Sequence, residues 1–322
     1  MNYAVNEWDK LKKVIVGTAT GARIPPIDKS MRTVNYADHD DVRSIKVGPY
    51  PQVVIDEANE DLENLCNFLK GEGVEVLRPQ QQHPVLYYDY CPRDLVFVHG
   101  EHCMATPMSL RCRKYNYQNI ENHLPGLQVA QTSNSDSLYN SDCIGDPDTL
   151  ALHETFPSFD AANIIRANDD LLYLVSNSGN KAGADFLREA TGLNVHTLEG
   201  VYSYMHIDST VAFLREGLML LNPSRIKSKD QLPEPFRSWD AIWATAPTDI
   251  GYYGNYNHAS VWINMNLFSV NPHLVVLEEH QHELRKQLAY YGIESAMLPI
   301  RHQRTLGGGF HCVTLDLERD GV

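Results

Sequence analysis

Long apolar runs are missing from this sequence. No apolar stretch approaches the roughly 20 residues that a membrane-spanning helix requires, and the first 17 residues hold no apolar segment of signal-peptide length. We therefore expect a cytoplasmic protein with no membrane partner. The 322 residues are 43% hydrophobic, which is ample for a large packed core.

Positive charge is scarce as well. Lysine and arginine number 27 against 41 aspartate and glutamate residues, and the net charge is -14 at pH 7. Such a surface repels nucleic acids, so we expect no nucleic-acid partner. It would favour small cationic molecules, although the simplest explanation of the acidity is solubility.

The six cysteines show no paired C-x-x-C spacing, so the sequence predicts neither a zinc site nor a disulfide framework. No G-x-G-x-x-G string follows an early strand, which argues against a dinucleotide fold. His280 and His282 lie two residues apart on a predicted helix, where their side chains would not share a face. We expect no metal and no cofactor. Most cysteines should be small buried residues, and one could be a nucleophile.

A succession of helix, glycine and strand recurs along the chain. Residues 58–69 place apolar side chains at helical spacing, glycines follow, and residues 74–77 are typical of a strand. The same succession occurs at 182–198 and at 283–298. Further apolar runs predict strands at 95–98, 171–175, 218–221 and 313–317. The repetition indicates one pseudo-symmetric α/β fold, with an open doubly wound sheet as the alternative.

Residues 23–50 are polar, contain three prolines and predict a long irregular segment. Ordered loops of this length are often lids or binding loops. A plain excursion over the surface is equally compatible with the composition.

The most unusual string runs from Leu306 through three glycines, Phe310 and His311 to Cys312. The glycines let the backbone pass very close to another group, and a cysteine presented there could be a nucleophile if neighbouring positive charge lowers its pKa. The alternative is a flexible turn that leads a buried structural cysteine into the strand at 313–317.

His206 and Asp208 form an H-x-D string, and in an extended segment residues two apart share a face. Histidine exchanges protons near neutral pH, which suits an acid/base role. Asp160, which precedes an apolar run, could orient that histidine as the acid of a catalytic triad does. Taken singly, a core histidine and a helix-capping aspartate are the simpler interpretations.

Asp94 and Arg225 each lie next to a predicted strand. A carboxylate at the edge of a strand is well placed to hold a cation, and an arginine there could clamp a carboxylate through two hydrogen bonds. Both could equally be turn residues exposed to solvent.

Together these residues suit chemistry on arginine, whose guanidinium group is effectively always protonated. Asp94 and Asp208 could hold the cation, Cys312 could attack its carbon, and His206 could protonate the departing amine. Arg225 could recognise the α-carboxylate. The set makes a complete site without a metal.

Five strings occur in the same order as in the arginine amidinotransferases, which the chain therefore resembles over nearly its whole length. The opening residues 6–17 are similar as well. The five strings are Pro92-Arg93-Asp94, Phe159-Asp160-Ala161-Ala162, Met205-His206-Ile207-Asp208, Asn222-Pro223-Ser224-Arg225 and Leu306 to Cys312. The resemblance implies a five-bladed α/β propeller of ββαβ units, formed by residues 1–322 as a single domain, with the active site on its central axis.

By motif position, the resemblance implies that Cys312 is the nucleophile, His206 the acid/base and Asp160 the carboxylate behind it. It implies that Asp94 and Asp208 bind the guanidinium group.

The resemblance assigns the amino-acid end of the substrate to Arg225 and Ser260. Ser203 and Met205 lie where the family varies with the acceptor amine. Asn163 replaces a second aspartate of the creatine-type enzymes. These departures predict an acceptor other than glycine, an amine of secondary metabolism.

The implied reaction is a ping-pong transfer of the amidino group from L-arginine to an amine, with release of L-ornithine. A deiminase-type hydrolase on the same fold would release citrulline instead. A third possibility is an arginine-binding protein without activity. The partners expected are small molecules, and a homodimer is possible.

Overall fold

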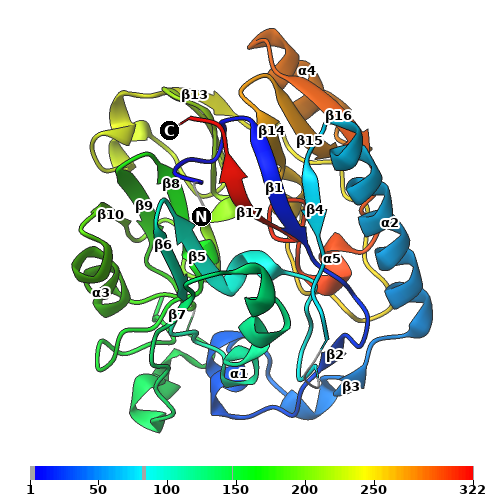
Figure 1. Ribbon diagram of the computed structural model, residues 1–322. Coiled ribbons are helices and arrows are strands. Elements are labelled where there is room, and N and C mark those ends of the chain that lie inside the picture. The colour runs from blue at the N-terminus through cyan, green and yellow to red at the C-terminus, as the bar shows by residue number, and fades with distance from the viewer. Residues whose placement is uncertain (1–3, 82–84, 147, 322) are drawn as a thin grey trace.

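The computed structural model describes residues 4–81, 85–146 and 148–321 (Figure 1). Within these ranges the strands form five sheets of three strands and one small sheet that pairs β2 (Arg23–Ile24) with β3 (Gly48–Pro49). In the described part of the chain, no helix combines the length and the apolar character that crossing a membrane requires.

The five larger sheets share one plan. Each begins with an antiparallel pair, and the third strand runs parallel to the second. In order of pairing they are β17-β1-β4, β5-β6-β7, β8-β9-β10, β11-β12-β13 and β14-β15-β16. The strands are β1 (Leu11–Val16), β4 (Glu75–Leu77), β5 (Val96–His99), β6 (His102–Ala105), β7 (Gln128–Val129), β8 (Ile164–Ala167), β9 (Asp170–Leu174), β10 (Asn194–Leu198), β11 (Val211–Arg215), β12 (Leu218–Leu221), β13 (Asp240–Trp243), β14 (Phe268–Asn271), β15 (Leu274–Glu278), β16 (Glu294–Leu298) and β17 (Thr314–Arg319).

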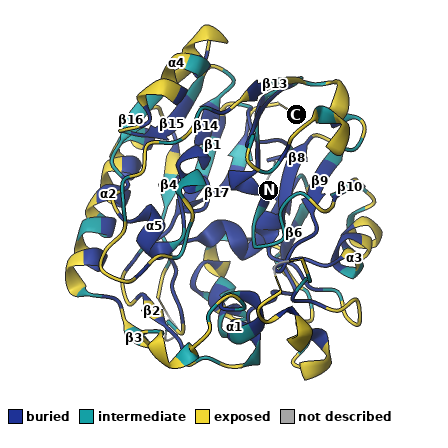
Figure 2. Ribbon diagram, turned by 180° about the vertical axis from the view of Figure 1, so that it is seen from behind, coloured by how far each residue is buried: buried dark blue, intermediate teal, exposed yellow. Residues whose placement is uncertain are grey.

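Parallel neighbours need a crossover connection, which is usually a helix. Three crossovers contain the predicted helices, α2 (Gln52–Gly71), α3 (Lys181–Thr191) and α4 (His282–Tyr290). The connections from β6 to β7 and from β12 to β13 contain 3-10 turns instead. The helices expose their outer sides, and the middle strands β1, β6, β9, β12 and β15 are mostly buried (Figure 2). In α2, the predicted apolar face at Ala58, Leu62, Leu65 and Leu69 is buried, which confirms the helical spacing.

The two ends of the chain meet in one sheet. β17, the last strand, pairs antiparallel with β1, and β1 pairs parallel with β4 (Figure 1). The sheet that begins the fold is therefore completed by the residues that follow the predicted nucleophile.

A short helical turn precedes the leading strand of each large sheet. The turns are η2 (Pro92–Asp94), η8 (Ala161–Asn163), η9 (Ile207–Ser209), η12 (Val261–Met265) and α5 (Gln303–Leu306). Each turn contacts the next in this order, and η2 also contacts β17, into which the chain continues from α5. Five segments far apart in the sequence therefore form a closed ring.

Three local predictions are corrected by the structure. Residues 206–208 are not extended, because Ile207–Ser209 is a 3-10 turn and His206 caps it. Residues 23–50 are less irregular than expected, since they contain β2, β3, η1 (Val42–Ser44) and the short helix α1 (Lys29–Val34), which Asp28 caps. His280 precedes α4 and hydrogen-bonds to Glu278 instead of lying on a helix.

Candidate active site

One pocket opens where the ring of turns meets the segment after α1. Its residues surround about 790 Å³ of space, part of which is open to solvent. Of the predicted residues, Met205, His206, Asp208, Arg225, Ser260 and Cys312 line it. Asp94 and Asp160 are buried behind this lining. Ser203 is not among the described lining residues and borders a neighbouring hollow.

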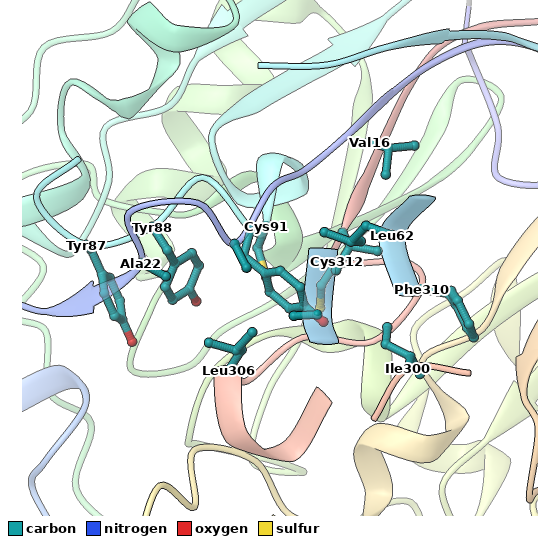
Figure 3. Packing of buried hydrophobic residues seen from close by; sticks show 14 of the residues in the cluster. Val16, Ala22, Leu62, Tyr87, Tyr88, Cys91, Ile300, Leu306, Phe310 and Cys312 are labelled. Carbon is teal, nitrogen blue, oxygen red and sulfur yellow. The ribbon is translucent and has the colours of Figure 1, made fainter. Parts of the chain in front are cut away.

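Glycines bring the Cys312 loop against its neighbours. A Cβ atom on Gly308 would collide with the Sγ atom of Cys91, and one on Gly309 would lie 2.8 Å from the side chain of Asn266. This confirms the close backbone approach that the three glycines predict. Cys312 is buried among apolar side chains that include Cys91 and Leu306 (Figure 3).

The Cys312 thiol faces acidic and neutral groups. Its Sγ atom lies 3.1 Å from Oδ2 of Asp208. The hydrogen bond with Cys91 raises the pKa of Cys312 well above its usual value, and burial and the charges of Asp208 and Asp94 raise it further. Among these neighbours the thiol is neutral at pH 7. A positive charge bound between the carboxylates would favour the thiolate and lower the pKa of Cys312.

Asn266, at the end of η12, supplies a hydrogen-bond donor to the sulfur. Its Oδ1 atom accepts from the backbone N–H groups of His311, at 2.9 Å, and Cys312, at 3.1 Å. Because these two donors fix the amide orientation, the Nδ2 group points to Sγ of Cys312 at 3.2 Å. The arrangement suits a sulfur that carries negative charge during a reaction.

His206 lies between two carboxylates. Its Nε2 atom is 3.0 Å from Oδ2 of Asp160, and its Nδ1 atom is 3.6 Å from Oδ1 of Asp94. Burial opposes a charge on the ring, but Asp94, the hydrogen bond to Asp160 and the charge of Asp208 outweigh it and raise the pKa of His206 to about 9. The imidazole is therefore protonated at neutral pH and can donate a proton.

Asp160 caps η8 but makes no capping bond with its side chain. Its Oδ1 atom instead accepts from the backbone N–H and the hydroxyl of Ser109, at 3.3 and 3.4 Å. These contacts hold the carboxylate of Asp160 toward His206, the orientation that the sequence suggested. The alternative, in which the side chain caps the helical turn, does not apply. Asn163 is buried among Leu174, Ser176 and Ser178 and is not a described lining residue.

Within the described residues, Asp94 has one oxygen atom that accepts no hydrogen bond, although Nδ1 of His206 lies 3.6 Å from it. Its Oδ2 atom is paired with the buried guanidinium group of Arg113, which also donates to the backbone oxygen of Cys91 at 2.9 Å and lies over the ring of Tyr88. In the described part of the chain, Oδ1 of Asp94 has no hydrogen-bond partner. A buried acceptor is costly to leave unsatisfied, so this oxygen is poised for a ligand.

Arg225 carries a positive charge that no described carboxylate balances within ion-pair distance. Its Nη1 atom donates to both oxygens of Ser209 and to Thr210, at 2.8–2.9 Å. Its Nη2 atom lies 3.4 Å from the hydroxyl of Ser260, and its guanidinium group covers the ring of Tyr202. Neutral partners fix the geometry and leave the charge available to an anion.

A charged network lies beneath the site. Asp316 accepts from Arg93, Arg166 and Arg319 at 2.5–2.7 Å, and Arg166 also pairs with Glu7. His311 links this network to the pocket, with Nε2 at 3.4 Å from Glu7 and Nδ1 at 3.1 Å from Asp208. Glu7 precedes β1, Arg93 lies on η2, Arg166 on β8, and Asp316 and Arg319 on β17, so the network joins these four segments.

Burial raises the pKa of Asp208, but the hydrogen bond from His311 and the charges of His311 and His206 outweigh burial and lower it to about 2. The carboxylate that touches the sulfur is therefore ionised at neutral pH. A positively charged ligand would meet a fixed negative charge here.

Sequence reasoning missed Arg113, Asn266, Cys91, His311 and Glu7. His311 lies in the glycine-rich string, and Glu7 lies in the opening residues 6–17. Arg113, Asn266 and Cys91 lie outside every string that predicted chemistry. Their roles depend on tertiary neighbours, which local spacing does not reveal.

Comparison with known sequences gives full-length relatives, although no family model matches the chain. Inosamine-phosphate amidinotransferase 1 of Streptomyces glaucescens is 41% identical, with 98% of this chain and 96% of that protein covered. L-arginine:L-lysine amidinotransferase of Pseudomonas savastanoi pv. phaseolicola is 32% identical, with 98% and 93% covered.

Solved structures agree with the sequence comparison. Inosamine-phosphate amidinotransferase STRB1 from Streptomyces griseus superposes with a TM-score of 0.95 at 39% identity, covering 100% of this chain and 98% of that one. SxtG, an amidinotransferase from Microseira wollei in the saxitoxin biosynthetic pathway, gives a TM-score of 0.87 at 27% identity with the same coverage.

Proposed function

The chain belongs to the amidinotransferase family, and from this premise we propose that it moves the amidino group of L-arginine to an amine through a covalent bond to Cys312, releasing L-ornithine. One observation carries the proposal. The Cys312 thiol, a protonated His206, two carboxylates and the unbalanced charge of Arg225 surround a single pocket.

The donor fits these groups by charge. The guanidinium group would bind between the free oxygen of Asp94 and the carboxylate of Asp208, beside the sulfur. The α-carboxylate would pair with Arg225, with the Ser260 hydroxyl beside it. An amino acid with a cation at one end and an anion at the other is then held at both ends.

Binding would also activate the nucleophile. The guanidinium charge would offset the charges of Asp94 and Asp208, which raise the pKa of Cys312. The thiol then loses its proton to solvent, and the resulting thiolate attacks the guanidinium carbon. The bond from that carbon to the side-chain nitrogen of arginine breaks, and His206 gives its proton to the departing amine, so ornithine leaves and an amidino group stays on Cys312.

The second half-reaction reverses these roles. Neutral His206 takes a proton from the incoming amine, whose nitrogen attacks the amidino carbon. The carbon–sulfur bond breaks, the amine leaves with the amidino group, and the Cys312 thiolate and protonated His206 remain. The thiolate takes a proton from solvent once the charged product has left. Asp160 would act as a positioning residue that keeps Nδ1 of His206 toward the reacting atoms.

We further infer that the five sheets are blades of one propeller, that residues 1–322 form a single domain, and that the site lies on its axis. The common strand plan and the ring of turns support this arrangement. A cytoplasmic location and a homodimer stay predictions. The acceptor would be an amine of secondary metabolism, which the saxitoxin-pathway neighbour supports.

The test is to incubate the protein with arginine and a panel of amines, and to identify the products by mass. The proposal predicts ornithine together with a guanidinylated amine. Citrulline would indicate hydrolysis, and the absence of both products would indicate binding without activity. Equal use of glycine and larger amines would contradict the proposed acceptor class.

A further inference from the structure

We propose that Tyr202 is a positioning residue for the donor substrate, whose ring holds the guanidinium group of Arg225 in the orientation that binds an α-carboxylate. The inference rests on the proposed reaction, in which Arg225 pairs with the α-carboxylate of arginine. It adds a residue on which the selection of a guanidine with an α-carboxylate depends. Tyr202 lies outside the five strings that predicted chemistry.

The contact between the two side chains is unusually close. The guanidinium carbon of Arg225 lies 3.5 Å from the centre of the Tyr202 ring, whereas the other cation–ring pairs among the described residues lie at 4.9–5.3 Å. At 3.5 Å the carbon is in van der Waals contact with the face of the ring. A planar cation on an aromatic face gains cation–π attraction and stacking, so the ring fixes the plane of the guanidinium group.

The protein uses one edge of this guanidinium group and leaves the other edge available. Nη1 of Arg225 donates to the backbone oxygen and the hydroxyl of Ser209 and to the hydroxyl of Thr210, at 2.8–2.9 Å. On the other edge, Nη2 lies 3.4 Å from the hydroxyl of Ser260, and Nε makes no hydrogen bond within the described residues. Nε and Nη2 together can grip a carboxylate through two parallel hydrogen bonds. The plane set by Tyr202 decides where this edge points.

Tyr202 is itself held by its surroundings. The backbone N–H of Asn177 donates to the backbone oxygen of Ser203 at 2.7 Å, directly after the tyrosine. The ring lies edge-on to Tyr204 and packs against a cluster of buried apolar side chains from β8 to β12. The ring is therefore in place before a donor binds, and Arg225 loses little side-chain freedom when it pairs with the ligand.

The ring holds the cation without neutralising it. Burial raises the pKa of Tyr202, so its hydroxyl carries no charge at pH 7. A carboxylate in the same place would pair with Arg225 and weaken its attraction to an anion. An aromatic face attracts the cation through its quadrupole and leaves the positive charge available.

The effect of the ring should depend on the α-carboxylate of the ligand. Agmatine is arginine without this group, so it would bring the same guanidinium group to Cys312 and no anion to Arg225. Loss of the Tyr202 ring should therefore weaken the binding of arginine and leave the binding of agmatine unchanged. The attack by Cys312 should keep its rate once arginine is bound, because the effect passes through Arg225, which is not a reacting group.

The first half-reaction tests this without an acceptor. Ornithine release is followed in single turnovers at increasing arginine concentration, which gives a half-saturating concentration and a maximal rate. Binding of agmatine is measured from its inhibition of ornithine release. In the wild type, arginine should bind at least about tenfold more tightly than agmatine, the effect of a hydrogen bond to a charged group.

Tyr202→Leu should raise the half-saturating arginine concentration about 3- to 30-fold, the range for a cation–π contact partly shielded from water, with the maximal rate and the inhibition by agmatine within about twofold of the wild type. Tyr202→Phe keeps the ring face and should resemble the wild type. Tyr290→Leu removes a tyrosine that is 86% exposed and should change neither constant.

A wild type that releases no ornithine would overturn the transfer reaction and this assignment with it. Normal ornithine release with equal binding of arginine and agmatine would overturn the roles of Arg225 and Tyr202 but not the transfer. If Tyr202→Leu weakens both ligands equally, or leaves the arginine constant unchanged, the ring does not position Arg225. A Tyr202→Phe variant as impaired as Tyr202→Leu would assign the effect to the hydroxyl and contradict the role of the ring face.

Discussion

The Sγ atom of Cys312 lies 3.1 Å from Oδ2 of Asp208, so the thiol faces a carboxylate. The Asp208 charge contributes to the raised pKa of Cys312. The same charge is proposed to bind the guanidinium group. Removing the Asp208 charge should therefore favour ionisation of the thiol and at the same time slow turnover.

Asp208→Asn should lower the pKa of Cys312 in the free enzyme and yet reduce ornithine formation by at least about 100-fold, since one contact to the cation is lost. The ultraviolet absorbance of the thiolate, corrected with Cys312→Ala, reports the ionisation. Asp240→Asn, at an exposed aspartate, is the control. An unchanged or higher thiol pKa in Asp208→Asn would contradict the electrostatic account.

The second prediction concerns pH. The pKa of His206 is raised to about 9 by carboxylates that outweigh burial, so the proton donor is present below that pH and is lost as the pH rises through it. Single-turnover ornithine formation should fall on the alkaline side near pH 9.

Asp160→Asn removes a hydrogen bond and a charge that favour protonated His206, so its alkaline limb should move to lower pH. Asp170→Asn disrupts a comparable pair with His196, at 2.7 Å and outside the pocket lining, and should leave the limb in place. Superimposable profiles for Asp160→Asn and the wild type would exclude His206 as the titrating acid.

The third prediction concerns Asn266, whose Nδ2 group donates to Sγ of Cys312. A hydrogen bond to a charged group contributes about 1.5–3 kcal/mol. Asn266→Ala should therefore slow ornithine formation about 10- to 100-fold and raise the pKa of Cys312, with a smaller effect on KM for arginine. Asn271→Ala, at the end of β14, is the control. A change confined to KM would show that the amide serves binding and not the sulfur.

The fourth prediction concerns stability. Asp316 is fully buried and pairs with three arginines. Asp316→Asn leaves these cations poorly compensated, and loss of one partner from a buried pair costs about 3–5 kcal/mol. Asp320→Asn breaks an exposed pair with Lys12, which should cost about 1 kcal/mol or less. Urea unfolding of both variants measures the difference, and equal losses would contradict the structural role of the network.

The helices at 52–71, 181–191 and 282–290 were predictable because each buries one apolar stripe and ends near glycine. The repetition of the unit was visible for the same reason. The arrangement of the five sheets could not be predicted from the sequence, because the pairing of β17 with β1 joins residues at opposite ends of the chain.

The site shows the same division. Cys312, His206, Asp160, Asp94, Asp208, Arg225 and Ser260 were named from their strings, and the structure brings them together around one pocket. Asn266 and Arg113 could not be found in this way. Each acts through a tertiary contact, Asn266 with Cys312 and Arg113 with Asp94, and asparagine or arginine in such positions has no local signature.

The most direct test of the central claim is to mix the enzyme with arginine in the absence of an acceptor, quench with acid, and measure the intact mass and the mass of the peptide that contains Cys312. The account predicts one added amidino group on that peptide and one ornithine released per active site, and neither product in Cys312→Ala. Ornithine release at a near-normal rate from Cys312→Ala, or stoichiometric ornithine without any adduct on Cys312, would contradict it.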